Sequence, residues 1–200
     1  MIRRRVAALA VVLVVALAAC GDDGGPTELT GFERSPAPSV AELALPEVGA
    51  DDDFDFRADD GELLVVYFGY TFCPDVCPTT LSDLRRALED LGDDADRVSV
   101  AMATIDPGRD TPEVISGYLT SFIDDGHPLR TEDDARLRAV TDVFGADYAV
   151  EALADGDVEV AHTGSLYAVD DRGELVVTWP FGITVEDLGN DLGLLLDRSA

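Results

Sequence analysis

Two cysteines separated by three residues are the part of this sequence best suited to chemistry. Cys73 and Cys77 enclose Pro74-Asp75-Val76, and each cysteine precedes a proline. This spacing allows a disulfide, and it also allows both sulfurs to bind one metal ion. Thiolate is the form that attacks disulfides and binds metals, and two thiolates favour Cu(I). A plain disulfide is the simpler alternative, although closing so short a loop stabilises a fold only weakly.

Other metals and further ligands are less well specified by the residues alone. Structural zinc usually takes four protein ligands, and three cysteines and two histidines in the whole chain supply them poorly. His127 lies in a polar stretch, where a solvated loop position is the more common case. His162 ends an apolar run, and a lone histidine at a strand end is more often structural than a ligand. Met102 lies within an expected strand and is expected in the core.

The cysteine pair lies between an expected strand and an expected helix. Residues 63–68 are a continuous apolar run, typical of a strand buried on both faces. The leucines that follow have helical spacing and end at Gly92: Leu81, Leu84, Leu88 and Leu91. Pro78 suits the first helical position, which places Cys77 at the cap and Cys73 in the loop before it. A helix N-terminus stabilises a thiolate.

The remaining elements predict an α/β fold. A second strand is expected at 98–105, and helices at 111–122 and 131–144, the latter begun by Thr131 and Asp134 as a capping box. The runs 158–169 and 174–179 predict a hairpin, and Thr184 begins a last helix. Short strands are expected near 41–45 and 54–56. This order favours a thioredoxin-like arrangement, a central mixed sheet flanked by helices on both faces.

The N-terminus has the pattern of a secretory signal. Three arginines, Arg3 to Arg5, precede an apolar run from Val6 to Ala19, which is shorter than the roughly 20 residues that span a bilayer. The end of this run, Leu17-Ala18-Ala19-Cys20-Gly21, resembles a bacterial lipobox, in which Cys20 is lipidated. We therefore expect a signal peptide at 1–19, a flexible tether at 20–39 and a domain at 40–200, anchored at the outer face of the bacterial cell membrane.

Composition excludes several classes of protein. The 200 residues include 41 acidic and 14 basic side chains, all of the latter arginine, for a net charge of −27. Such a chain repels phosphate backbones, so a nucleic-acid partner is excluded. Hydrophobic residues make up 46% of the chain, which excludes a disordered protein. Three cysteines are too few for a disulfide scaffold.

Three blocks of the sequence resemble the Sco/SenC family and occur in the order of that family. The first is residues 68–81, with both cysteines, the second is residues 105–113, and the third begins at His162-Thr163. The resemblance extends over about residues 40–197. It implies a thioredoxin-like domain tethered outside the cytoplasm, which binds one copper ion.

The resemblance also implies a site and a function. The ligands carried over are Cys73, Cys77 and His162, with Asp106 and Arg109 near the site. Ala161 departs from the family, which usually has an acidic residue there. The implied function is a copper metallochaperone for the dinuclear copper centre of cytochrome c oxidase, holding Cu(I) and also Cu(II). The implied partners are the copper-bearing subunit of the oxidase, another copper chaperone or a thiol reductant.

Two alternatives are enzymes. A thiol–disulfide oxidoreductase would use Cys73 or Cys77 as nucleophile through a mixed disulfide, and it would not need His162. Copper binding would need it, so this histidine discriminates between the two functions. A peroxiredoxin-like peroxidase is disfavoured, because Cys73 lies in a tandem-cysteine loop rather than alone at a helix start.

Overall fold

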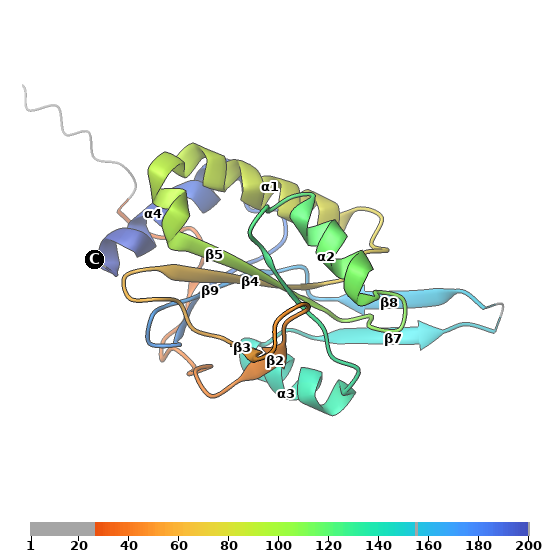
Figure 1. The fold of residues 1–200 in the computed structure, drawn as a ribbon. Coiled ribbons are helices and arrows are strands. Elements are labelled where there is room, and N and C mark those ends of the chain that lie inside the picture. The colour runs from red at the N-terminus through yellow and green to blue at the C-terminus, as the bar shows by residue number, and fades with distance from the viewer. Residues whose placement is uncertain (1–26, 155, 200) are drawn as a thin grey trace, which may run out of the picture.

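A mixed sheet forms the centre of the protein. The computed structural model describes residues 27–154 and 156–199 (Figure 1). Within them, six strands pair in the order β1-β10-β9-β4-β5-β6. β4, β5 and β6 are parallel to one another, whereas β9 and β1 run antiparallel to their neighbours. The strand bounds are Phe32–Glu33 (β1), Leu63–Gly69 (β4), Val98–Thr104 (β5), His127–Leu129 (β6), Leu166–Val169 (β9) and Leu175–Trp179 (β10).

Helices cover both faces of this sheet, as the sequence predicts. In Figure 1, α1, α2 and α4 lie above the sheet, and α3 lies below it. A short 3-10 turn, η1, follows α1. The bounds are Val76–Leu91 (α1), Gly92–Arg97 (η1), Pro112–Thr120 (α2), Asp134–Phe144 (α3) and Val185–Arg198 (α4). On the α3 side, the rings of Phe68, Phe144 and Tyr167 pack edge to face with centroids 5.2–5.9 Å apart. Such aromatic packing holds the buried centre of the sheet against α3.

Two hairpins form separate two-stranded sheets: β2 (Ala44–Pro46) with β3 (Asp53–Asp55), and β7 (Tyr148–Ala152) with β8 (Val158–His162). The expected strand 158–169 is therefore wrong as a single strand. Its first part pairs with β7 and its second with β10. The break lies at 163–165, where the Thr163 N–H donates to the Asp147 carbonyl and closes the base of the β7–β8 hairpin.

Two helix starts differ from the prediction. α1 begins at Val76, so Cys77 lies in its first turn and not at its cap. The Cys73 sulfur accepts the Cys77 N–H at 3.3 Å, which takes the role of a cap. α3 begins after Asp133, whose carboxylate accepts from the Arg136 N–H, so Thr131 is not its cap. The starts expected at Thr111 and Thr184 are confirmed.

The N-terminal part of the described chain is attached to the domain. Phe32–Glu33 pairs with β10, and the buried carboxylate of Asp191 accepts hydrogen bonds from the N–H groups of Thr30 and Gly31 at 2.9 and 2.8 Å. It also accepts from the Trp179 indole at 2.7 Å. The fold thus begins ahead of residue 40. The expected signal peptide and Cys20 lie outside the described residues, and no described helix is long and apolar enough to cross a bilayer.

Candidate metal centre

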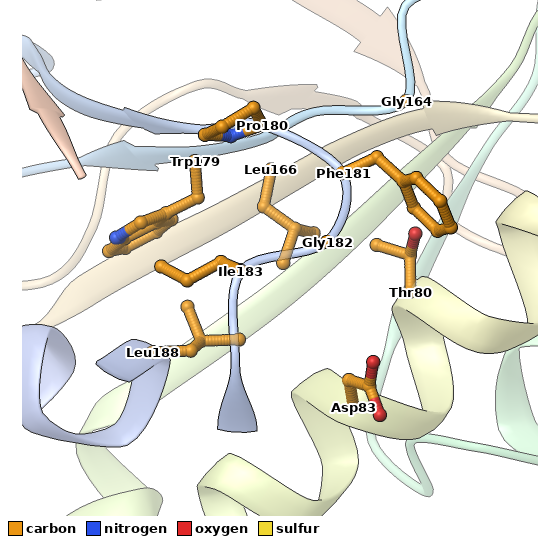
Figure 2. Close-up of a pocket in the computed structure, with 10 residues that line it drawn as sticks. All are labelled: Thr80, Asp83, Gly164, Leu166, Trp179, Pro180, Phe181, Gly182, Ile183 and Leu188. Atoms are coloured by element: carbon orange, nitrogen blue, oxygen red, sulfur yellow. The ribbon is translucent and has the colours of Figure 1, made fainter. Parts of the chain in front are cut away.

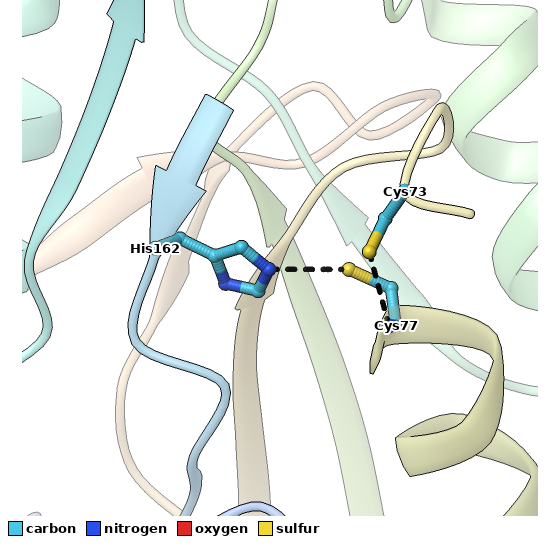
Figure 3. Close-up of side chains that lie close together, drawn as sticks. All are labelled: Cys73, Cys77 and His162. Atoms are coloured by element: carbon cyan, nitrogen blue, oxygen red, sulfur yellow. Dashed lines mark hydrogen bonds between the residues drawn. The ribbon is translucent and has the colours of Figure 1, made fainter. Parts of the chain in front are cut away.

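Three side chains from separate segments converge at the carboxyl end of β4. Cys73 comes from the loop after β4, Cys77 from the first turn of α1, and His162 from the last position of β8 (Figure 3). Their ligand atoms all lie within 4.8 Å of one another, and the Cys77 sulfur is 3.5 Å from His162 Nε2. Two thiols and an imidazole are a donor set suited to Cu(I), so these residues fit the expected ion.

The two thiols have different environments. Burial raises the pKa of Cys73, but hydrogen bonds from the backbone N–H groups of Cys77 and Asp75 outweigh it and hold the pKa below its usual value. Cys77 is fully buried, and burial raises its pKa to about 12. Cys73 is therefore the thiol that ionises readily.

This difference predicts selective alkylation of the reduced protein. Because the pKa of Cys73 is lowered, its thiolate and its reaction with iodoacetamide should appear at a lower pH than for an ordinary cysteine. Cys77 should remain protonated and unmodified from about pH 6 to 10. Peptide mass spectrometry across this range measures both. Equal labelling of the two cysteines at every pH would contradict the assigned environments.

The orientation of His162 suits metal binding. Its Nδ1 lies 3.2 Å from the Thr163 carbonyl, which can only accept, so Nδ1 carries the hydrogen and Nε2 presents a lone pair to the sulfurs. Burial lowers the pKa of the ring, which favours the neutral form that ligates metals. A backbone carbonyl thus orients the imidazole, although Ala161 supplies no carboxylate.

Asp106 and Arg109 lie beside the cysteine loop and outside the three-residue cluster. The Arg109 Nε donates to the buried carboxylate of Asp106. The guanidinium lies 4.9 Å from the ring centroid of Phe72 and 5.8 Å from that of Tyr70. These contacts hold the part of the loop just ahead of Cys73 in place.

Asp110 is a site-supporting residue that sequence reasoning missed. Its fully buried carboxylate accepts from the Thr71 N–H at 3.1 Å, from the Thr71 hydroxyl at 2.6 Å and from the Thr104 hydroxyl. It therefore connects the cysteine loop to the end of β5. Its position in the block 105–113 indicated a place near the cysteine loop. Both segments follow neighbouring parallel strands, and the carboxyl ends of such strands meet at one edge of the sheet.

The other histidine lies away from the site. His127 is in β6, half-buried, with Nδ1 2.8 Å from Glu47 Oε1 and its ring against Phe54. The expected solvated loop position is wrong, because His127 pairs with Ala101 of β5 in the sheet and its ring has two side-chain contacts. The core position expected for Met102 is confirmed.

A small apolar hollow lies near α1, apart from the three ligand side chains (Figure 2). Its volume of about 10 Å³ holds about one water molecule. Thr80, Leu166 and Phe181 are among its lining residues. This hollow is too small for an organic substrate.

Comparison with known proteins identifies the family. The SCO1/SenC family model matches residues 50–196 of the chain. The chain belongs to the SCO1/SenC family. A SCO2-like protein of Rickettsia prowazekii is 31% identical over 134 residues, which cover 64% of this chain and 63% of that protein. The chain thus spans a little under two thirds of this SCO1/SenC relative.

Solved structures of the SCO1/SenC family confirm the thioredoxin-like fold. Bradyrhizobium japonicum ScoI with copper bound is 30% identical, with a TM-score of 0.65, and the match covers 79% of this chain and 97% of that one. Apo Sco1 of Thermus thermophilus is 28% identical, with a TM-score of 0.66, over 86% and 95% of the two chains. The family therefore includes a protein whose structure contains copper.

Proposed function

We propose that this protein is a membrane-anchored copper metallochaperone that binds one copper ion through Cys73, Cys77 and His162. The observation that carries the proposal is the convergence of two sulfurs and one imidazole nitrogen within 4.8 Å. Membership of a family that includes a copper-bound structure supports it. The soft sulfur donors favour Cu(I), and the imidazole nitrogen also suits Cu(II).

The side chains have distinct roles in holding the ion. Each thiol releases its proton to solvent as its sulfur binds, and Cys73 ionises first because its pKa is lowered. His162 offers Nε2 without losing a proton, since its neutral ring is held by the Thr163 carbonyl. The ion leaves by ligand exchange with the thiolates of a partner.

The proposed recipient is the copper-bearing subunit of cytochrome c oxidase, whose dinuclear copper centre the protein helps to assemble. The donor of copper is another copper chaperone, and a thiol reductant keeps Cys73 and Cys77 reduced. The proposed location is the outer face of the bacterial cell membrane, with the lipid on Cys20 as anchor. The acidic, lysine-free composition does not interfere with this role, because the partner is a protein and not a nucleic acid.

A second candidate function is thiol–disulfide exchange, which the different environments of the two cysteines favour. The Cys73 thiolate would attack a partner disulfide, form a mixed disulfide and release the other partner sulfur as a thiolate. Cys77 would then release its proton to solvent and attack the Cys73 sulfur. This step closes a Cys73–Cys77 disulfide and releases the partner as a dithiol, so two electrons pass to the partner.

An anaerobic Cu(I) titration tests the leading proposal. The reduced protein should bind one Cu(I) per chain, and His162→Ala should weaken binding by at least roughly tenfold because an inner-sphere nitrogen is lost. His127→Ala is the matched control, since it removes the other histidine of the chain, and it should leave the affinity unchanged. Competition with a chromophoric Cu(I) chelator measures all three affinities.

The possible outcomes separate the two functions. No Cu(I) binding by the unmodified protein would exclude the metallochaperone. Equal losses in the two histidine variants would exclude His162 as a specific ligand. Tight binding that depends on His162, with disulfide exchange that does not, would assign both activities to one site.

A further inference from the structure

The hydroxyl of Tyr67 is a buried polar group that has no part in the metal centre described above. Tyr67 lies in the middle strand β4 and is fully buried. Its hydroxyl has no hydrogen-bond partner in the described ranges 27–154 and 156–199. A buried hydroxyl without a hydrogen-bond partner is less stable than one in water, and such groups are rare in folded proteins.

The Tyr67 ring lies close to Gly69 and to the Cys77 sulfur. Tyr67 and Gly69 are two apart in β4 and face the same side of the sheet. A Cβ on Gly69 would lie 2.5 Å from Tyr67 Cε1 and 3.1 Å from Cys77 Sγ. The phenol ring and the sulfur therefore pack over the same bare glycine, and a side chain at this position would displace one of them.

Burial raises the pKa of the Tyr67 hydroxyl, and the side chains of Cys77 and Thr80 also affect this pKa, so both lie near the hydroxyl. The Thr80 hydroxyl already donates to the Val76 carbonyl at 2.8 Å, so it has only lone pairs to offer. The Cys77 sulfur is a weak acceptor while it is a thiol. It becomes a strong acceptor when it is a thiolate, because hydrogen bonds to charged groups are roughly twice as strong as neutral ones.

Copper binding would produce the Cys77 thiolate in a buried environment, where a charged group is less stable than in water. Cys77 has no exposed surface, so water cannot solvate its sulfur once the proton has left. The backbone N–H of Cys77 itself donates to the sulfur of Cys73. A phenol that is already in place and unpaired needs no rearrangement to donate to the Cys77 sulfur.

We propose that Tyr67 is a positioning residue, whose hydroxyl donates a hydrogen bond to the Cys77 thiolate when copper is bound and thereby raises the affinity for Cu(I). This inference rests on the proposed copper-binding function. It assigns the unpaired hydroxyl of the copper-free protein to the copper-bound state. The ring also lies edge to face against His162, with centroids 6.3 Å apart, so one side chain contacts two of the three ligands.

Tyr167 provides a matched control within the same sheet. It lies in β9 beside β4, it is almost fully buried, and its hydroxyl also lacks a hydrogen-bond partner among the described residues. Its ring packs with Phe68 and Phe144 on the opposite face, away from the sulfurs. Tyr167→Phe therefore removes the same atom from a comparable environment that has no metal ligand.

The test compares Tyr67→Phe and Tyr167→Phe with the unmodified protein in two measurements. Cu(I) affinity comes from competition with a chromophoric chelator, and the stability of the copper-free protein comes from thermal unfolding. Tyr67→Phe should weaken Cu(I) binding by roughly 10–100-fold, the range for loss of an outer-sphere partner. It should leave the copper-free protein as stable as the unmodified one or more stable, because no hydrogen bond is lost there. Tyr167→Phe should leave the Cu(I) affinity unchanged.

Any of the following results would contradict the inference. An unchanged Cu(I) affinity in Tyr67→Phe would exclude the hydrogen bond to sulfur. A destabilised copper-free protein would assign the hydroxyl to Thr80 and to the fold. Equal loss of affinity in both variants would show a general effect of core substitution. If the unmodified protein binds no Cu(I), the proposed function fails together with the inference, and that result is visible before any variant is compared.

Discussion

Replacing Cys73 with serine is expected to abolish tight Cu(I) binding without unfolding the protein. The substitution removes one of two soft donors, and a serine hydroxyl neither ionises at neutral pH nor suits Cu(I). The loss should exceed the roughly 10–100-fold that outer-sphere changes produce. Anaerobic chelator competition measures the loss.

The fold should persist because the serine can perform the structural role of Cys73. The Cys73 sulfur accepts the Cys77 N–H in the first turn of α1, and a serine oxygen is a common acceptor at that place. Circular dichroism and thermal unfolding check this. Cys20→Ser is the control: it also replaces a cysteine sulfur by a serine oxygen, ahead of the expected domain, and it should leave the Cu(I) affinity unchanged. Full-strength Cu(I) binding by Cys73→Ser would remove Cys73 from the ligand set.

Replacing Asp110 with alanine is expected to cause the largest loss of stability among single changes near the site. Its carboxylate accepts three hydrogen bonds, from the Thr71 N–H and from the hydroxyls of Thr71 and Thr104. Without it, the buried Thr104 hydroxyl and the Thr71 N–H lose their acceptor, so the free energy of unfolding should fall by about 2–5 kcal/mol. Urea denaturation measures this change.

The same change should loosen the loop that carries Cys73. Thr71 begins this loop, and its tie to β5 runs through Asp110. Asp124→Ala is a suitable control, because it removes the same charge from an exposed position and should change stability by less than about 0.5 kcal/mol. A loss in Asp124→Ala as large as that in Asp110→Ala would show that net charge, and not the buried contacts, determines the result.

The two long central strands were predictable from the sequence, and β7 was not. β4 and β5 are continuous apolar runs, so hydrophobicity alone locates them. β7 was not predicted, because four of its five residues are exposed. It forms a strand because it pairs with β8, and not because it is buried. The caps of α1 and α3 were misplaced because the choice between neighbouring polar residues depends on contacts that only the fold provides.

The candidate site was predictable in part. The spacing of Cys73 and Cys77 indicates a site directly, since both flank the start of one helix. His162 lies 85 residues from Cys77, and its residue type and neighbours favoured a structural role. Only the family resemblance indicated this histidine, and the fold brings it to the sulfurs. Tyr67 gave no signal, because an aromatic residue in an apolar strand has the pattern of ordinary core.

The separate pairing of β7 and β8 would make release of the metal, under the proposed function, an ordered process. The imidazole is at the end of a largely exposed hairpin, whereas both sulfurs belong to the buried centre of the domain. Segments with few buried side chains undergo local unfolding at a small free-energy cost, while the core opens only with the whole protein. In the proposed transfer we therefore expect the bond between the metal and the His162 nitrogen to break first. An incoming thiolate of the proposed partner would enter at the position that the nitrogen leaves, and the two remaining sulfurs would keep the ion from escaping to solvent.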